Sequence, residues 1–237
     1  MSSAEDADAA RRAEVAAASS GGDDGQAPFV ARGWLLVCGA LAGGSAAAWW
    51  LPSALLDWQP AHALDQPWRF VTAAWVHWHE QHLLANLAGC AVVAWLGVAA
   101  RLPSAAAGAL AAAWPLTHAG LLLQPALAHY GGASGVLHAA AAVAACWLVV
   151  GRRNGALAGS GRRARLIGVA IAAGLVAKVL LEKPWGGPLA AEPAWGIAVA
   201  VAAHASGAAA GAVAALTAMA ARRTLAQRQG ASGLPPQ

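Results

Sequence analysis

The sequence predicts an all-α membrane protein, a bundle of six transmembrane helices with the N- and C-termini in the cytoplasm. Three observations lead to this prediction, and the first is composition. Of the 237 residues, 59% are hydrophobic and 11% are charged, and the mean hydropathy is +0.51. A soluble domain carries roughly 25% charged residues, so this balance is typical of a membrane protein.

The second observation is that the apolar residues form six long runs. They cover residues 34–51, 82–99, 104–123, 134–150, 164–181 and 195–221. Runs of about 18 residues span a bilayer as helices, whereas barrel strands are shorter and alternate between polar and apolar residues. Around the membrane domain of residues 31–221 we expect two disordered cytoplasmic tails, residues 1–30 and 222–237. The first tail lacks the basic start and the apolar stretch of a signal peptide.

The third observation is the placing of the basic residues, which sets the orientation of each helix. Taken in chain order, arginines stand before the first run, between the second and third, between the fourth and fifth or at the start of the fifth, and after the sixth. They are Arg32, Arg101, Arg152, Arg153, Arg162, Arg163, Arg165, Arg222, Arg223 and Arg228. The alternate connections, 52–81, 124–133 and 182–194, hold only Arg69 and Lys183. By the positive-inside rule, these three connections lie outside the cytoplasm.

Two further features agree with a bilayer environment. Basic clusters between apolar runs are a topology signal, so the net charge of +4 does not indicate a nucleic-acid partner. Tryptophans gather at the predicted outer interface, where amphipathic rings prefer to lie. They are Trp49, Trp50, Trp58, Trp68, Trp75, Trp78, Trp185 and Trp195.

The sequence predicts no metal, no cofactor and no disulfide. The three cysteines lie inside apolar runs without CxxC spacing, so we expect small buried hydrophobic side chains. They are Cys38, Cys90 and Cys146. The stretch His77, His79, Glu80 and His82 has one residue between the glutamate and the last histidine, not the two of an H-E-x-x-H zinc motif. A zinc or copper site in this stretch is the alternative interpretation.

Four polar residues lie at a similar depth in the outer half of the predicted bundle. His82 and Asn86 open the second helix from the outer side and, being four residues apart, share one face. Ser134 opens the fourth helix from the same side. His204 lies nine residues into the sixth run, about 13 Å below the interface at 1.5 Å per residue. Polar groups are costly in hydrocarbon, so each is expected to have a partner or a function.

Small residues would let the fourth and sixth helices approach closely. Gly207 and Gly211 share a face with His204, and Gly132 and Gly135 flank the start of the fourth helix. If these two helices meet, the serine at the start of the fourth can donate a hydrogen bond to the histidine. A base would then lie beside a nucleophile, which is what serine chemistry requires.

An oxyanion site is also available at this position. The backbone N–H of Ser134 lies in the first turn of its helix, where N–H groups have no intrahelical partner. The side chains of Asn86 and His82 add two further donors on a neighbouring helix.

Three stretches together resemble the rhomboid intramembrane serine proteases. They are HWHEQHLLAN at 77–86, GASG at 132–135 and AHASGAAAG at 203–211, and the resemblance spans about residues 70–215. It implies that Ser134 is the nucleophile and His204 its base, in a dyad without an acid, and that His82 and Asn86 help to bind the oxyanion. We expect His77 to support the loop or the oxyanion side chains. The resemblance further implies a substrate protein with a single transmembrane helix.

His138 departs from the pattern of well-known rhomboids, which commonly carry a tyrosine at this position. GASGVLH is more similar to the rhombosortase branch, which implies exported substrates with a C-terminal Gly-Gly sorting tail, in a bacterial inner membrane with the active site facing outward. The substitution leaves open how His204 is held, and whether His138 competes with it as the base.

Several alternative interpretations remain at this point. Ser134 is also a suitable helix N-cap, and the chain is also compatible with a catalytically silent relative that binds membrane helices. A transporter would carry ionisable residues through both leaflets, unlike this chain. Lys178 and Glu182, four residues apart, form either a structural pair or a substrate-recognition site. The sequence indicates no partner for three other histidines, His62, His118 and His129.

Overall fold

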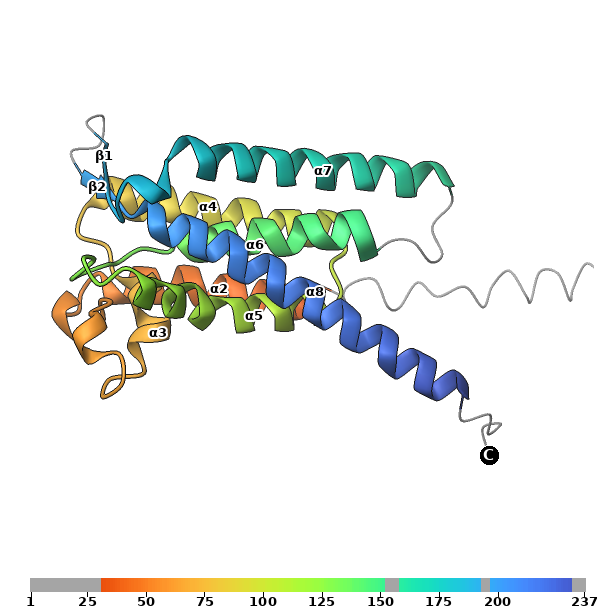
Figure 1. The fold of residues 1–237 in the computed structure, drawn as a ribbon, viewed down its shortest axis with the longest axis horizontal. Helices are drawn as coiled ribbons and strands as arrows, with labels where there is room; N and C mark the ends of the chain where they lie inside the picture. Colours follow the sequence, from red (N-terminus) through yellow and green to blue (C-terminus); the bar gives the residue numbers. More distant parts are fainter. Residues whose placement is uncertain (1–30, 152–157, 193–196, 232–237) are drawn as a thin grey trace, which may run out of the picture. The chain divides into compact units, whose positions relative to one another are not determined.

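The computed structural model describes residues 31–151, 158–192 and 197–231, and helices make up most of them. The six longest helices in these ranges each overlap one of the apolar runs seen in the sequence. They are α2 (Arg32–Ala48), α4 (Glu80–Ala99), α5 (Ser104–Ala119), α6 (Ser134–Cys146), α7 (Ala158–Leu181) and α8 (Val201–Ala231). Figure 1 shows them side by side as one bundle. Two of them continue as tighter or wider turns, α5 through η4 (Gly120–Leu123) and α6 through the π-helical η5 (Trp147–Gly151).

Four helical stretches in the described part of the chain are long and apolar enough to cross a membrane. They are Glu80–Ala99, Ser104–Leu123, Gly161–Gly186 and Val201–Arg228. Ser134–Val150 is apolar but shorter. Large apolar side chains such as Leu36, Trp95 and Leu181 are exposed on the outward faces of the helices, as suits contact with lipid. The prediction of an α-helical membrane protein is therefore confirmed.

The sequence prediction is wrong at the start of the sixth helix. Residues expected to begin it form strand β2 (Ile197–Val199), which pairs antiparallel with β1 (Ala190–Glu192). The register places Ala191 opposite Ala198. The β-branched residues Ile197 and Val199 favour a strand over a helix, and α8 begins only after this hairpin.

The structure also differs at the far end of α8, which continues through residues 222–231, where the sequence predicted a disordered tail. Alanine, leucine, glutamine and arginine dominate this stretch, and all are good helix formers. Four other sequence expectations lie outside the described residues. They concern the segments 1–30 and 232–237, Trp195, and the pair Arg152 and Arg153.

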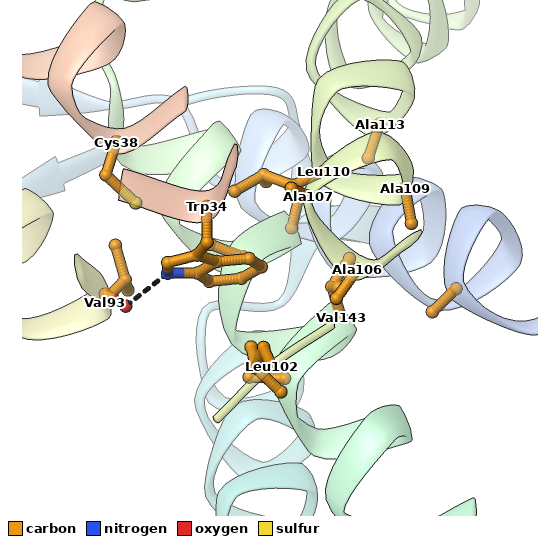
Figure 2. Close-up of a cluster of buried hydrophobic side chains, with 14 of the residues drawn as sticks. Trp34, Cys38, Val93, Leu102, Ala106, Ala107, Ala109, Leu110, Ala113 and Val143 are labelled. Carbon is orange, nitrogen blue, oxygen red and sulfur yellow. Dashed lines mark hydrogen bonds between the residues drawn. The ribbon is translucent and has the colours of Figure 1, made fainter. Parts of the chain in front are cut away.

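Helix packing places α8 at the centre of the bundle, along both α5 and α6, while α2 packs against α4 and α5. Helix α7 contacts mainly α6 and lies at the edge of the bundle in Figure 1. Figure 2 shows the core around Trp34, whose Nε1 donates a hydrogen bond to the carbonyl oxygen of Val93 at 2.8 Å. Gly97 leaves room for this indole, since a Cβ there would overlap its ring. The tryptophan therefore fixes α2 on α4 with its polar atom satisfied.

The connection between α2 and α4 is folded around a buried ion pair. It contains η1 (Ser53–Leu55), η2 (Pro60–His62), α3 (Arg69–Thr72) and η3 (Ala73–Trp75). Arg69 Nη1 lies 3.0 Å from Asp57 Oδ1, and neither side chain is more than 4% exposed. The other oxygen of Asp57 accepts a hydrogen bond from His129 Nδ1 at 2.7 Å, and the backbones of Trp58 and Tyr130 pair as a β-bridge. This connection is thereby joined to the segment that leads into α6.

The three histidines without an evident partner in the sequence each have one in the structure. Besides His129, His118 Nδ1 donates to the carbonyl oxygen of Phe70 at 2.6 Å, and His62 Nδ1 lies 3.2 Å from Asp65 Oδ2. Their partners come from the folded α2–α4 connection, whose tertiary structure the sequence pattern does not reveal.

The predicted interface tryptophans divide into two groups. Trp50 and Trp185 are 84% and 70% exposed, whereas Trp58 is fully buried and packs edge-on against the ring of Phe70, with centroids 5.0 Å apart. The interface prediction is therefore wrong for Trp58, because the β-bridge to Tyr130 draws it inward. All three cysteines are free and buried or half-buried, as predicted: Cys38, Cys90 and Cys146.

Candidate active site

Ser134 is the first residue of α6, and a glycine turn directs the chain into it. Gly132 has φ +140°, a conformation that glycine tolerates better than other residues. Its N–H donates to Ala73 O at 3.0 Å, and its carbonyl accepts from the Tyr130 hydroxyl at 2.6 Å. Burial raises the pKa of Tyr130 to about 12, so this hydroxyl keeps its proton and continues to donate. The nucleophile candidate thus follows a turn tied to the α2–α4 connection.

The side chain of Ser134 does not cap its helix. The N-cap residue is Ala133, and no side-chain cap bond is present at the start of α6. The N-cap interpretation of Ser134 is therefore wrong. Its hydroxyl is instead directed at another helix, while its backbone N–H lies in the first turn, where it has no intrahelical acceptor.

The structure places His204 of α8 beside this hydroxyl, with 2.9 Å between Ser134 Oγ and His204 Nε2. Close backbone contact between the two helices makes the approach possible. A Cβ at Gly207 would overlap the carbonyl oxygen of Gly135, and a Cβ at Gly211 would overlap that of Ala139. His204 is 4% exposed, so its imidazole is buried within the protein.

Glu182 contacts His204, and the sequence does not predict this contact. It follows the last residue of α7, and its Oε2 lies 2.8 Å from His204 Nδ1. Its other oxygen lies 2.5 Å from Lys178 Nζ, so the expected i,i+4 pair is present as well. The resemblance implied a dyad without an acid, whereas the structure places a carboxylate on the imidazole. The spacing from Lys178 was the only sequence signal for this residue.

His82 and Asn86 line the same cavity as Ser134 and His204. Asn86 Nδ2 donates one hydrogen bond to the backbone oxygen of His82 at 3.0 Å, which leaves the second amide hydrogen available to a ligand. The ring of His77 packs edge-on against that of His82, with centroids 4.9 Å apart. Burial lowers the pKa of His77, and its Nδ1 donates to Trp75 O at 3.1 Å. His77 is therefore placed, as a neutral ring, to support His82.

His138 holds the face of the His204 ring. The two imidazoles stack with centroids 4.1 Å apart and planes 11° from parallel. His138 Nδ1 donates to the backbone oxygen of Ser134 at 2.7 Å, one helical turn earlier. His138 therefore contacts the backbone carbonyl of Ser134, whereas the hydroxyl of Ser134 is paired with His204.

The cavity containing these groups has a volume of about 310 Å³ and is also lined by the β-hairpin through Ala190, Ala191 and Val199. His138, Glu182 and His204 bring ligand-type atoms within 4.8 Å of one another. Stacked, nearly parallel imidazoles do not aim their nitrogen lone pairs at a common point, and both nitrogens of His204 are already bonded. Among the described residues this is the one such group of three, so the side chains of the His77–His82 stretch do not bring three ligand-type atoms together in this way. The donor set suits proton transfer better than metal binding.

The family model described as Rhomboid domain matches residues 64–221, a range that contains every residue of the cavity. No curated protein and no solved structure matches the chain.

Proposed function

The chain belongs to the rhomboid family, and on that premise we propose that it is an intramembrane serine endopeptidase that cleaves a membrane-spanning segment of another protein. The observation that carries the proposal is the 2.9 Å contact between Ser134 Oγ and His204 Nε2, at the wall of a cavity that also holds Asn86 and His82. A nucleophile, a base and candidate oxyanion donors are the groups that acyl transfer needs.

The proposed reaction has two halves. Ser134 Oγ attacks the scissile carbonyl carbon while His204 Nε2 takes the hydroxyl proton, and the tetrahedral oxyanion accepts hydrogen bonds from Ser134 N–H, Asn86 and His82. Collapse breaks the C–N bond, and His204 returns the proton to the leaving amine. Water then attacks the acyl-enzyme ester with His204 again as the base, which releases the new carboxyl terminus and restores the serine. Small, helix-weakening residues in the substrate would help to expose its carbonyl.

We further propose that all six helices cross the membrane, with both termini in the cytoplasm and the cavity near the outer face. Exposed Trp50, Trp78 and Trp185 at the end of the bundle that holds Ser134 support this orientation, because tryptophan prefers the bilayer interface. Arg101 stands at the other end of α4, as the positive-inside rule requires. The proposed location is the inner membrane of a bacterium, with the cavity facing the periplasm.

For the substrate, we propose an exported protein with a C-terminal Gly-Gly sorting tail, as the rhombosortase-like GASGVLH stretch implies. Alanines at 85, 190 and 191 line the cavity, and a surface of small side chains leaves room for a substrate backbone. Such a tail carries its small residues next to a single membrane helix, so the scissile bond would lie near the depth of Ser134.

The test is co-expression with a membrane-anchored reporter that ends in a Gly-Gly tail. Wild-type enzyme is expected to release a shortened reporter, and mass spectrometry of its new C-terminus locates the cleaved bond. Ser134→Ala and His204→Ala are expected to abolish release while inserting in the membrane at wild-type levels. A fluorophosphonate probe should label wild type and not Ser134→Ala. Release by Ser134→Ala refutes the proposal, and a folded wild type that neither cleaves nor labels supports the catalytically silent alternative.

A further inference from the structure

The nitrogen of His204 that faces away from Ser134 is bound to a carboxylate. Glu182 Oε2 lies 2.8 Å from Nδ1, and Ser134 Oγ lies 2.9 Å from Nε2. The two ring nitrogens of an imidazole point in different directions, so hydroxyl, ring and carboxylate follow one another in a chain of two hydrogen bonds. The His204 side chain is 5% exposed and that of Glu182 is 17% exposed, so bulk water competes little for this contact.

We propose that Glu182 is the positioning residue of a Ser134–His204–Glu182 triad. This inference rests on the proposed protease function. An ionised carboxylate can only accept hydrogen bonds, so Nδ1 must carry the ring proton, and Nε2 is left with the lone pair that takes the serine proton. When the imidazolium forms, the carboxylate stabilises its charge and itself stays ionised.

The backbone fixes the place of Glu182 at the end of α7. Its N–H donates to Lys178 O at 3.1 Å, which continues the helix through this residue. The next residue, Lys183, adopts φ 50° and ψ 59°, a left-handed conformation that ends the helix. The chain then turns toward β1 of the hairpin, so Glu182 lies where α7 gives way to the cavity wall.

The two oxygens of Glu182 have different partners. Oε1 binds Lys178 Nζ, whose side chain is 53% exposed, while Oε2 binds the buried His204. An exposed ion pair contributes little to stability, so anchoring Lys178 does not account for a carboxylate at this position. The carboxylate matters more to the buried base, because an imidazolium shielded from water requires a counter-charge.

Stacking and hydrogen bonding together fix the orientation of His204. His138 covers one face of the ring, and the two in-plane bonds set its rotation and its tautomer. Removing the carboxylate therefore leaves the ring covered but free to adopt the wrong tautomer. A contact that only holds the ring in place would not control this tautomer.

The experiment compares Glu182→Gln, Glu182→Ala and Glu182→Asp in the full-length protein, with Lys178→Met as the matched control. A glutamine can donate its amide hydrogen to Nδ1, which moves the ring proton to Nε2 and prevents it from accepting the serine proton. We expect Glu182→Gln to lower kcat by about 10³–10⁴-fold, as observed for wrong-tautomer variants of serine triads. Glu182→Ala should lose less, and Glu182→Asp should recover part of the rate.

Two readouts separate positioning from packing. KM should change little, and the rate of Ser134 labelling by a fluorophosphonate, which needs no bound substrate, should fall in parallel with kcat. Lys178 also lines the cavity, so Lys178→Met can alter KM. Because the variant keeps the carboxylate on His204, its kcat should fall by less than about tenfold. Thermal unfolding in detergent checks that each variant is folded. If Glu182→Gln does not fold, the kcat of Glu182→Asp is compared with that of wild type instead.

The outcomes distinguish this inference from the proposed function. A Glu182→Gln variant within threefold of wild type, or one that is less impaired than Glu182→Ala, overturns the triad. So does a loss confined to KM. If Ser134→Ala is inactive in the same assay, the protease function survives such a result as a dyad without an acid. Cleavage by Ser134→Ala would instead refute the proposed protease function itself.

Discussion

The closest approach between α6 and α8 gives a prediction that can be worked out from distances. Replacing Gly207 with alanine would place a Cβ 2.7 Å from the carbonyl carbon of Gly135, and closer still to its oxygen. Ordinary contact begins at about 3.4 Å, so the two backbones must separate by at least about 0.7 Å. The atoms that meet are the new Cβ and the backbone of Gly135, so no change of side-chain rotamer can relieve the overlap. Overpacking of this kind typically costs about 1–3 kcal/mol of stability.

The separation also reaches the pair of Ser134 and His204, because His204 lies one turn before Gly207 on α8. A retreat of this size would lengthen the 2.9 Å contact between Ser134 and His204 to about 3.6 Å, beyond hydrogen-bond range. A misplacement of about 1 Å can cost 10²-fold in rate, so we expect kcat to fall by about 10–10²-fold.

The assay measures reporter cleavage and fluorophosphonate labelling beside thermal unfolding in detergent. The matched control is Gly39→Ala on α2, where a Cβ meets nothing within 4 Å, and which should leave both rate and stability near wild type. If Gly207→Ala cleaves at the wild-type rate with unchanged stability, the close crossing of the two helices does not position the pair, and the reasoning is refuted.

Three further predictions concern the surroundings of the pair. Asn86→Ala should lower kcat by about 10²–10³-fold with little change in KM, the usual loss of one oxyanion donor; an effect on KM alone would contradict this role. Asp57→Asn removes the carboxylate shared by Arg69 and His129 and should cost about 3–5 kcal/mol, measured by unfolding, because it leaves the guanidinium buried without a counter-charge. An unchanged unfolding midpoint would show that the ion pair is dispensable. Burial lowers the pKa of His77 in the folded state, so its contribution to stability is present above the ordinary histidine pKa and is lost as pH falls toward the lowered value. The free energy of unfolding should therefore fall less between pH 7.5 and about 5 in His77→Gln than in wild type. An identical pH dependence in the two proteins would contradict the lowered pKa of His77.

The helical part of the fold could be predicted from the sequence because its signals are local. Hydrophobic runs mark membrane helices, and the run of residues 104–123 coincides with α5 and its continuation η4. The crossing of α6 and α8 was predictable for a similar reason, since Gly207, Gly211 and His204 repeat at helical spacing on one face. Each of these inferences needs only the order of residues within one helix.

The missed features depend on contacts between distant segments. Glu182 reaches His204 only because the chain turns at Lys183 and returns through a β-hairpin, and neither feature follows from helical periodicity. The apolar run predicts a helix from residue 195, although pairing with β1 makes Ile197–Val199 a strand. The contact of Asp57 with His129 joins residues 72 positions apart through the fold of the α2–α4 connection.

The β-bridge between Trp58 and Tyr130 has a consequence for engineering. Residues 49–79 and 127–132 are held together by backbone pairing and by the shared carboxylate of Asp57. They therefore form one exchangeable module, although the chain between them runs through two membrane helices. A chimaera that imports the first stretch from a relative should keep Ser134 in its position beside His204 only when it imports the second stretch with it.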